Sequence, residues 1–307
     1  NGNVTFNVEV AGGYNANATW SGVSGSTTVF NSTVYMLKGT GSNGRGLTLT
    51  GAGNFTFNGA IKSFDAVDVI TAKTTGSIGL TIQNTGTTII AGQMGSSLTG
   101  QVNINTASGT VKLQNDNTGL GAYGIQGSTN SYAQATVNSY AIKFTRGTIL
   151  LGNAKGLGTQ DFTMGSSSTT STDPVVLLTD GAYTIANNIY MGCSTAGAGA
   201  NYTIGGNTDS NSTYSGNITI NKSGTIQQIA TTGSNKLTVS GAITAATTGR
   251  TLTFDGEGAQ TISGNISTSL GLIVGASANA ANSSARVVTL SGTNSYTGGV
   301  TINNGVL

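Results

Sequence analysis

Short segments in which apolar and polar residues alternate, each closed by a glycine, recur along the chain. Residues 47–51 read Leu-Thr-Leu-Thr-Gly, residues 237–241 Leu-Thr-Val-Ser-Gly, residues 252–256 Leu-Thr-Phe-Asp-Gly, and residues 288–292 Val-Thr-Leu-Ser-Gly. Alternation with a period of two is typical of a β-strand with one buried face, and glycine marks the turn that ends such a strand. The pattern predicts many short strands separated by glycine corners.

A longer repeat also predicts a short strand followed by a corner. Residues 97–105, 213–221 and 295–303 share Tyr or Leu, then Ser or Thr, then Gly, and end in Val or Ile, any residue, Ile and Asn. The two apolar side chains of that last segment point to one face of a strand. Asparagine suits the corner that follows, because its amide can bond the backbone. Each repeat therefore predicts a strand with an asparagine corner.

Strands this short are stable only when they stack, since a stack buries a continuous apolar interior that one coil lacks. No long stretch shows the 3.6-residue apolar period of a helix. The predicted fold is all-β: a right-handed parallel β-helix, or β-solenoid, forming a single elongated domain. Parallel crossovers strongly favour the right hand. We expect roughly 20 residues per coil.

The repeats divide the chain into two parts. Residues 1–46 show weak repeat character and are predicted to form irregular N-terminal coils or a cap. Residues 47–307 are predicted to be a β-helix that ends within a repeat. An uncapped last coil favours either a longer parent protein or head-to-tail self-association, in which an exposed strand edge pairs with another copy.

Composition narrows the classes of function. The 307 residues include 48 glycines, and 7% of residues are charged, against about a quarter in an average domain. Lysine and arginine do not cluster, which argues against nucleic-acid binding. No apolar run approaches the ~18 residues that indicate a membrane-spanning helix. The single cysteine, Cys193, excludes an intramolecular disulfide.

Few residue types remain for catalysis. The chain has no histidine, which removes Ser-His-Asp and Cys-His catalysis and the commonest metal ligand. Cys193 is interpreted as an inert thiol in the core or in a loop. We therefore predict no catalytic residue, no metal and no cofactor, and hence a protein that is not an enzyme.

Carboxylate pairs support an alternative, an enzyme acting on polysaccharides. Asp65 and Asp68 lie three residues apart, which places them on opposite faces of a strand. Asp255 and Glu257 flank Gly256 and share a face, so that they could bind Ca²⁺ or act as acid and base on a sugar. Exposed, solvated corners are the simpler interpretation of both pairs.

Two further patterns suggest ligand contacts. Trp20, Tyr14 and Tyr35 form a candidate platform for stacking on sugars, and thus a carbohydrate-binding module, although aromatic residues also fill end coils and caps. Thr48 and Thr50 resemble the Thr-x-Thr arrays of ice-binding surfaces, but no regular ladder of this pattern is visible in the sequence.

Residues 288–307 closely resemble the autotransporter-associated β-strand repeat, through Thr-Asn-Ser-Tyr-Thr-Gly-Gly and the Val-Thr-Ile-Asn that follows. Residues 147–164 and 180–189 are similar to continuations of the same repeat. This family occurs in passenger domains of type V secreted bacterial proteins. The resemblance implies a right-handed β-helix on the bacterial cell surface or secreted from the cell. It implies a structural or adhesive rod that contacts cell-surface or matrix components, including glycans, and serves adhesion, matrix or filament formation.

Overall fold

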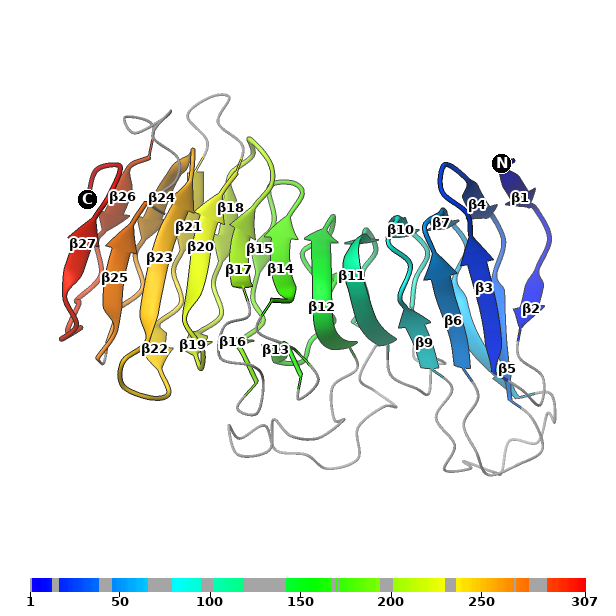
Figure 1. The fold of residues 1–307 in the computed structure, drawn as a ribbon, viewed down its shortest axis with the longest axis horizontal. Helices are drawn as coiled ribbons and strands as arrows, with labels where there is room; N and C mark the ends of the chain where they lie inside the picture. Colours follow the sequence, from blue (N-terminus) through cyan, green and yellow to red (C-terminus); the bar gives the residue numbers. More distant parts are fainter. Residues whose placement is uncertain are drawn as a thin grey trace. The chain divides into compact units, whose positions relative to one another are not determined.

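The computed structural model describes residues 2–12, 17–38, 46–65, 79–94, 102–118, 142–166, 169, 172–193, 201–229, 236–267, 269–275 and 286–307. Within these residues every regular element is a β-strand (Figure 1). The described residues contain no helix of the length and apolarity needed to cross a membrane. The contacts of the chain group it into two compact units, which are described separately.

The first unit contains β1 to β11 and most of β12. Its strands are β1 (Val4–Phe6), β2 (Val10–Gly12), β3 (Ala18–Gly22), β4 (Thr27–Phe30), β5 (Val34–Lys38), β6 (Gly46–Gly51), β7 (Asn54–Phe57), β8 (Ile61–Asp65), β9 (Gly79–Ile82), β10 (Thr87–Ile90), β11 (Val102–Leu113) and β12 (Ile142–Leu151).

The second unit contains β13 to β27. Its strands are β13 (Phe162–Met164), β14 (Pro174–Thr179), β15 (Thr184–Ile185), β16 (Ile189–Met191), β17 (Asn201–Gly206), β18 (Ser212–Tyr214), β19 (Ile218–Ile220), β20 (Gly224–Gln228), β21 (Lys236–Val239), β22 (Ile243–Ala245), β23 (Thr251–Gly256), β24 (Ala259–Ile262), β25 (Gly271–Val274), β26 (Val288–Leu290) and β27 (Val300–Ile302).

In the first unit the strands pair in three parallel rows. One row runs β3–β6–β9 and on to the start of β11. The second runs β1–β4–β7–β10 and on to the end of β11. The third runs β2–β5–β8. Each coil thus contributes one strand to each row, which is the plan of a parallel β-helix.

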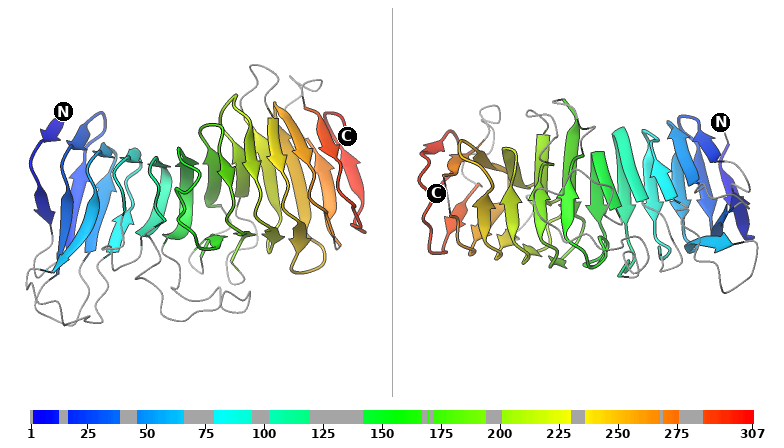
Figure 2. Two further views of the ribbon diagram at one scale, coloured as in Figure 1. Left: turned by 180° about the vertical axis from the view of Figure 1, so that it is seen from behind. Right: turned by 90° about the horizontal axis from the view of Figure 1, so that it is seen from below.

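The second unit repeats this plan (Figure 2). Its rows are β13–β16–β19–β22, β14–β17–β20–β23–β25–β27, and β15–β18–β21–β24–β26. We call the second of these the long row. All of these pairings are parallel, so the all-β parallel β-helix predicted from the sequence is confirmed. Its right hand stays a prediction from the crossover rule.

The coils are longer and more variable than the expected ~20 residues. The register shifts by 20 residues between Thr251 and Gly271 but by 33 between Phe55 and Thr88. The estimate was wrong because it counted strands and corners only, whereas the connections between rows add chain of different lengths. Strand register is conserved although coil length is not.

The core is built from rows of equivalent residues. On the inner face of the long row, Leu252 aligns with Leu272, and Phe254 aligns with Ile226 and Val274. Each of these side chains is buried, while Thr253 between Leu252 and Phe254 is half-buried. Burying a large apolar side chain contributes about 1.5 to 3 kcal/mol, so stacking the coils is the main stabilising term.

The glycine corners have two different physical causes. Gly51 and Gly256 adopt φ angles of +83° and +88°, which favour glycine. At Gly241 the reason is close packing: a Cβ atom there would lie 1.9 Å from the carbonyl oxygen of Gly216 in the preceding coil. The next glycine of this ladder, Gly264, would place a Cβ 1.9 Å from the Gly241 oxygen. The coils approach so closely at this corner that no side chain fits.

The described part of residues 1–46 already follows the coil plan. β3 aligns residue by residue with β6, and β4 aligns with β7. Weak repeat character in the sequence there is compatible with regular strand pairing, because alternation can be satisfied by aromatic as well as aliphatic residues.

Candidate functional site

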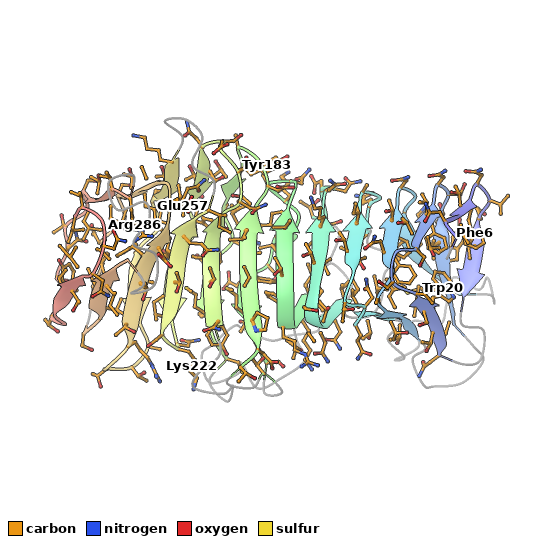
Figure 3. The ribbon with its side chains drawn as sticks, turned by 45° about the horizontal axis from the view of Figure 1, so that its top comes forward. Phe6, Trp20, Tyr183, Lys222, Glu257 and Arg286 are labelled. Carbon is orange, nitrogen blue, oxygen red and sulfur yellow. The ribbon has the colours of Figure 1, made fainter. Side chains whose placement is uncertain are left out.

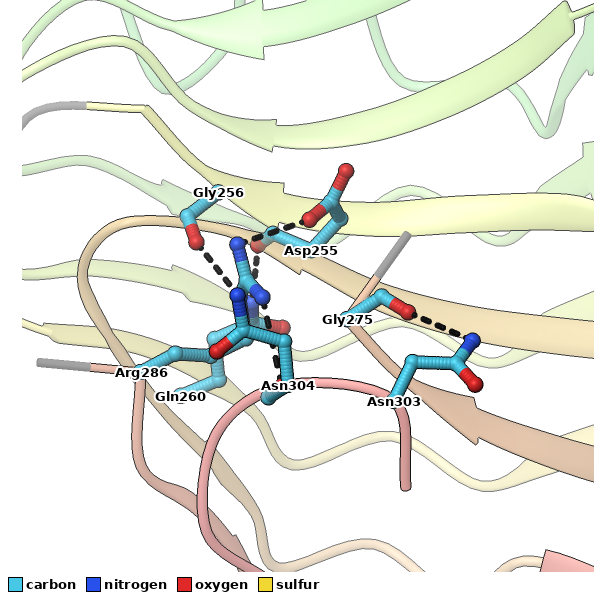
Figure 4. A network of polar contacts seen from close by, with 7 residues as sticks. All are labelled: Asp255, Gly256, Gln260, Gly275, Arg286, Asn303 and Asn304. Carbon is cyan, nitrogen blue, oxygen red and sulfur yellow. Dashed lines mark hydrogen bonds and ion pairs between the residues drawn. The ribbon is translucent and has the colours of Figure 1, made fainter. Parts of the chain in front are cut away.

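A buried ion pair joins two of the charged residues of the second unit (Figure 4). Arg286 is 1% exposed, and one of its Nη atoms lies 2.9 Å from a carboxylate oxygen of Asp255, at the end of β23. Arg286 also donates hydrogen bonds from Nε to the Gly256 carbonyl (2.6 Å) and from Nη1 to the Asn304 carbonyl (3.2 Å). The guanidinium therefore ties together three successive coils.

This network changes the interpretation of the Asp255 and Glu257 pair. The Asp255 carboxylate faces Arg286, and Gln260 donates a hydrogen bond of 2.5 Å to the Asp255 backbone carbonyl. Glu257 lies at the corner and is half-buried. A sugar-cleaving site would present its arginine to the substrate, but the guanidinium here is enclosed by the protein. The contacts of Asp255 and Arg286 are those of a structural pair.

The other carboxylate pair falls largely outside the described residues. Asp65 is the last residue of β8, where only the backbone is described, and Asp68 is not described. Among the described residues, no group of three or more Cys, Asp or Glu side chains is placed to hold a metal ion.

Trp20 is half-buried and packs against an aromatic stack of the first unit (Figure 3). In β3 it aligns with Leu49 of β6, which is fully buried, so Trp20 occupies an inner-face position. Its ring stacks on Phe30 with a centroid distance of 5.0 Å and an interplanar angle of 20°. Phe30 also stacks between Phe6 (5.1 Å) and Phe57 (4.9 Å). Trp20 thus packs with a core stack.

Of the remaining members of the proposed aromatic platform, the described residue Tyr35 does not join this stack. Tyr35 lies between the buried residues Val34 and Met36, so alternation places its ring on the outer face of β5. Its hydroxyl donates a hydrogen bond of 3.3 Å to the carboxylate of Glu9. Tyr14 lies outside the described residues. Trp20 and Tyr35 therefore occupy opposite faces of their strands and present no common surface to a sugar.

Cys193 is buried, as one of its two interpretations predicted. It lies close enough to Tyr202 to influence its ionisation. Burial raises the pKa of Tyr202 well above its usual value, and the nearby Cys193 thiol and Asp173 carboxyl raise it further. The Tyr202 hydroxyl is buried and has no hydrogen-bond partner within the described part of the chain. Sequence reasoning missed this group, because nothing local distinguishes Tyr202 from other inner-face aromatics.

Two of the three asparagine corners predicted from the longer repeat are confirmed, whereas Asn105 lies within β11 and accepts a hydrogen bond of 2.9 Å from Nε of Arg146. Asn221 donates a hydrogen bond of 2.7 Å to the Gly192 carbonyl, and Asn303 donates one of 3.1 Å to the Gly275 carbonyl. In both cases the acceptor belongs to the preceding coil. The amide bonds the backbone of a neighbouring coil and so holds consecutive coils in register.

Outward-facing side chains also form ladders. In the first unit the exposed amides of Asn7, Asn31 and Asn58 are joined by hydrogen bonds of 2.7 and 2.8 Å. In the second unit Thr203, Thr225 and Thr253 align on the outer face of the long row. The candidate functional surface is therefore a set of uncharged rows of amides and hydroxyls. Compared with known proteins, the chain matches no family model, no curated protein and no solved structure.

Proposed function

We propose that this chain is a structural or adhesive β-helix scaffold of the bacterial cell surface or its surroundings, without catalytic activity. The observation that carries the proposal is how the chain uses its few chemically distinctive residues. Arg286 pairs with Asp255 inside the coils, and Trp20 stacks on Phe30. The outer faces instead present repeated hydroxyls and amides.

Rows of equivalent uncharged side chains suit weak contacts that are repeated from coil to coil along the stack. A single contact contributes little, but many equivalent contacts on one scaffold raise the overall affinity through effective concentration. This favours partners that are themselves extended, namely cell-surface or matrix components and their glycans. The resemblance of residues 288–307 to the autotransporter-associated repeat supports the same placement and the same role.

The proposal is tested by displaying the 307-residue chain on a non-adherent bacterium that has no adhesins of its own. We expect such cells to settle from suspension and attach to coated surfaces several-fold more than cells that carry only the display anchor. Surface exposure is checked by antibody labelling, so that poor display is not mistaken for poor adhesion.

A matched variant tests whether an outward row of side chains, rather than the scaffold itself, is responsible for adhesion. Replacing Thr203, Thr225 and Thr253 by lysine changes one outward row and leaves the inner face intact. A full-length, well-displayed chain that causes neither settling nor attachment would refute the adhesive role. Release of reducing sugar ends from polysaccharides by the purified chain would instead establish the enzymatic alternative.

A further inference from the structure

Five threonines align on one outer face of the second unit, one from each of five consecutive coils. Register pairs Thr184 with Thr213, Thr213 with Thr238, Thr238 with Thr261, and Thr261 with Thr289, along β15, β18, β21, β24 and β26. Their side chains are exposed or half-buried. The sequence hides this row because 23 to 29 residues separate successive members.

A row of serines, Ser215, Ser240, Ser263 and Ser291, runs beside the threonines, one residue beyond the ends of β18, β21, β24 and β26. The backbone N–H groups of Ser240, Ser263 and Ser291 donate hydrogen bonds of 2.9 Å to the carbonyls of Tyr214, Val239 and Ile262, the last strand residues of the preceding coil. Ser215 makes the same bond at 2.8 Å. All four serines are exposed. We call the threonine and serine rows together the threonine face.

The threonine face is a two-dimensional lattice of hydroxyls. Neighbouring coils are spaced by about 4.8 Å, and residues two apart on a strand by about 6.6 Å. None of the five threonine hydroxyls forms a hydrogen bond with another group in the described part of the chain. Each hydroxyl can donate one hydrogen bond and accept others, as a water molecule can. The threonine row therefore offers unused donors and acceptors, whereas in the serine row the Ser215 hydroxyl donates a hydrogen bond of 3.4 Å to the Ile185 carbonyl.

We propose that the threonine face binds ice. The spacing between its coils is close to one repeat of the water oxygens on a prism face of hexagonal ice, so bound water can bridge hydroxyls of neighbouring coils without breaking the lattice. The threonines and serines carry no charge, which suits a neutral solid, and the exposed Lys236, two residues before Thr238 in β21, is a charged neighbour on the same face. The rows contain no aromatic side chain for stacking on a sugar ring, which favours ice over a crystalline polysaccharide.

This inference goes beyond the proposed scaffold function and does not depend on where the protein is located. It concerns the second unit only, and binding would require no other molecule. Methyl groups of the threonines add apolar contact beside each hydroxyl, which helps order water between the rows.

The test grows ice slowly in a dilute solution of the purified 307-residue chain and measures how the protein partitions between ice and liquid. Thr238→Tyr places a bulky ring in the middle of the threonine row, where β-propensity is retained. The matched control is Thr225→Tyr, the same change on the outer face of the long row. We expect the original chain and the control to enter the ice equally, and Thr238→Tyr to enter it about tenfold less.

A second variant, Thr261→Lys, protects the test against a folding defect in Thr238→Tyr, and both are checked by circular dichroism and melting. Exclusion of the original chain from ice would overturn the proposal. Equal partitioning of Thr238→Tyr and Thr225→Tyr into the ice would overturn it as well. Binding to crystalline cellulose or chitin but not to ice would assign the face to a glycan. Adhesion in the cell-display experiment is unaffected by any of these results.

Discussion

An arginine with 1% exposure is stable in a protein only if its charge and its donors are satisfied. Arg286 meets this condition through the Asp255 carboxylate and two backbone carbonyls. These acceptors come from coils that precede and follow it. At the scale of the residue, Arg286 links neighbouring coils through its charge and its donors.

Removing Asp255 should therefore be more damaging than removing the pair. We expect Asp255→Ala to lower the free energy of unfolding by about 2 to 3 kcal/mol, less than for a fully buried pair, because the Asp255 side chain is 25% exposed. Combining Asp255→Ala with Arg286→Met should recover a large part of that loss. Urea unfolding of the two single variants and the double variant gives the coupling energy. Additive losses would show that the two residues do not act as a pair.

At the scale of the element, the corners between strands restrict which residue types can occupy them. The glycine ladder Gly216, Gly241, Gly264 and Gly292 follows strands of the third row of the second unit, and each later member lies against the carbonyl oxygen of the one before it. The strands themselves accept any apolar residue inside and a small polar residue outside. The corner, rather than the strand, is the most restrictive part of the repeat.

A methyl group at such a corner must push two coils apart. We expect Gly241→Ala to lower the free energy of unfolding by about 2 kcal/mol or more, in the range of overpacked cores. Gly299→Ala is the matched control, since a Cβ there would have no neighbour within 4 Å. Thermal melting of both variants checks the prediction. A loss at Gly299 as large as that at Gly241 would contradict the close-packing explanation.

The elements also show what local patterns can predict. Alternation, glycine and asparagine are local properties, and they predicted strands, corners and the bonds of Asn221 and Asn303. Which strand stacks on which was not predictable, because the connections differ in length. The similar segments 213–221 and 295–303 illustrate this: β19 pairs in the row β13–β16–β19–β22, whereas β27 ends the long row. The same motif serves any strand followed by a corner.

The candidate site was less predictable than the fold for the same reason. Asp255 and Arg286 are far apart in sequence, and only stacking brings them within 2.9 Å. Trp20 stacks on Phe30 in the structure, but no pattern in one sequence separates an aromatic ring that faces inward from one that faces outward when the register is unknown. The threonine face escaped notice because its members recur at unequal intervals.

At the scale of the whole molecule, stability should depend little on pH near neutrality. The chain has no histidine and 7% charged residues. Among the described residues, burial raises the pKa values of Tyr202 and Tyr214. Tyr214 donates a hydrogen bond of 2.9 Å to the Gly205 carbonyl, whereas Tyr202 has no partner among the described residues.

We expect constant stability from about pH 6 to 9 and a progressive loss above about pH 10, the pKa of tyrosine in an unfolded chain. The sign follows from linkage: a folded-state pKa above the unfolded value gives stability that is present below the unfolded pKa and is lost as pH rises toward the folded one. Urea unfolding across the pH range measures this. Tyr202→Phe should weaken the alkaline loss without lowering stability at neutral pH, because it removes an unpaired buried hydroxyl. If the double variant Tyr202→Phe/Tyr214→Phe loses as much stability at high pH as the original chain, the two tyrosines are rejected as the cause.

The variation in coil length has a consequence for engineering. Register holds whether a coil spans 20 or 33 residues, so the strands on either side of a corner keep their pairing when the chain between them is longer. Peptides inserted at such corners would be presented at intervals set by the coil spacing, with their order along the stack fixed by their order in the gene. Several binding segments could therefore be inserted into this fold at chosen separations.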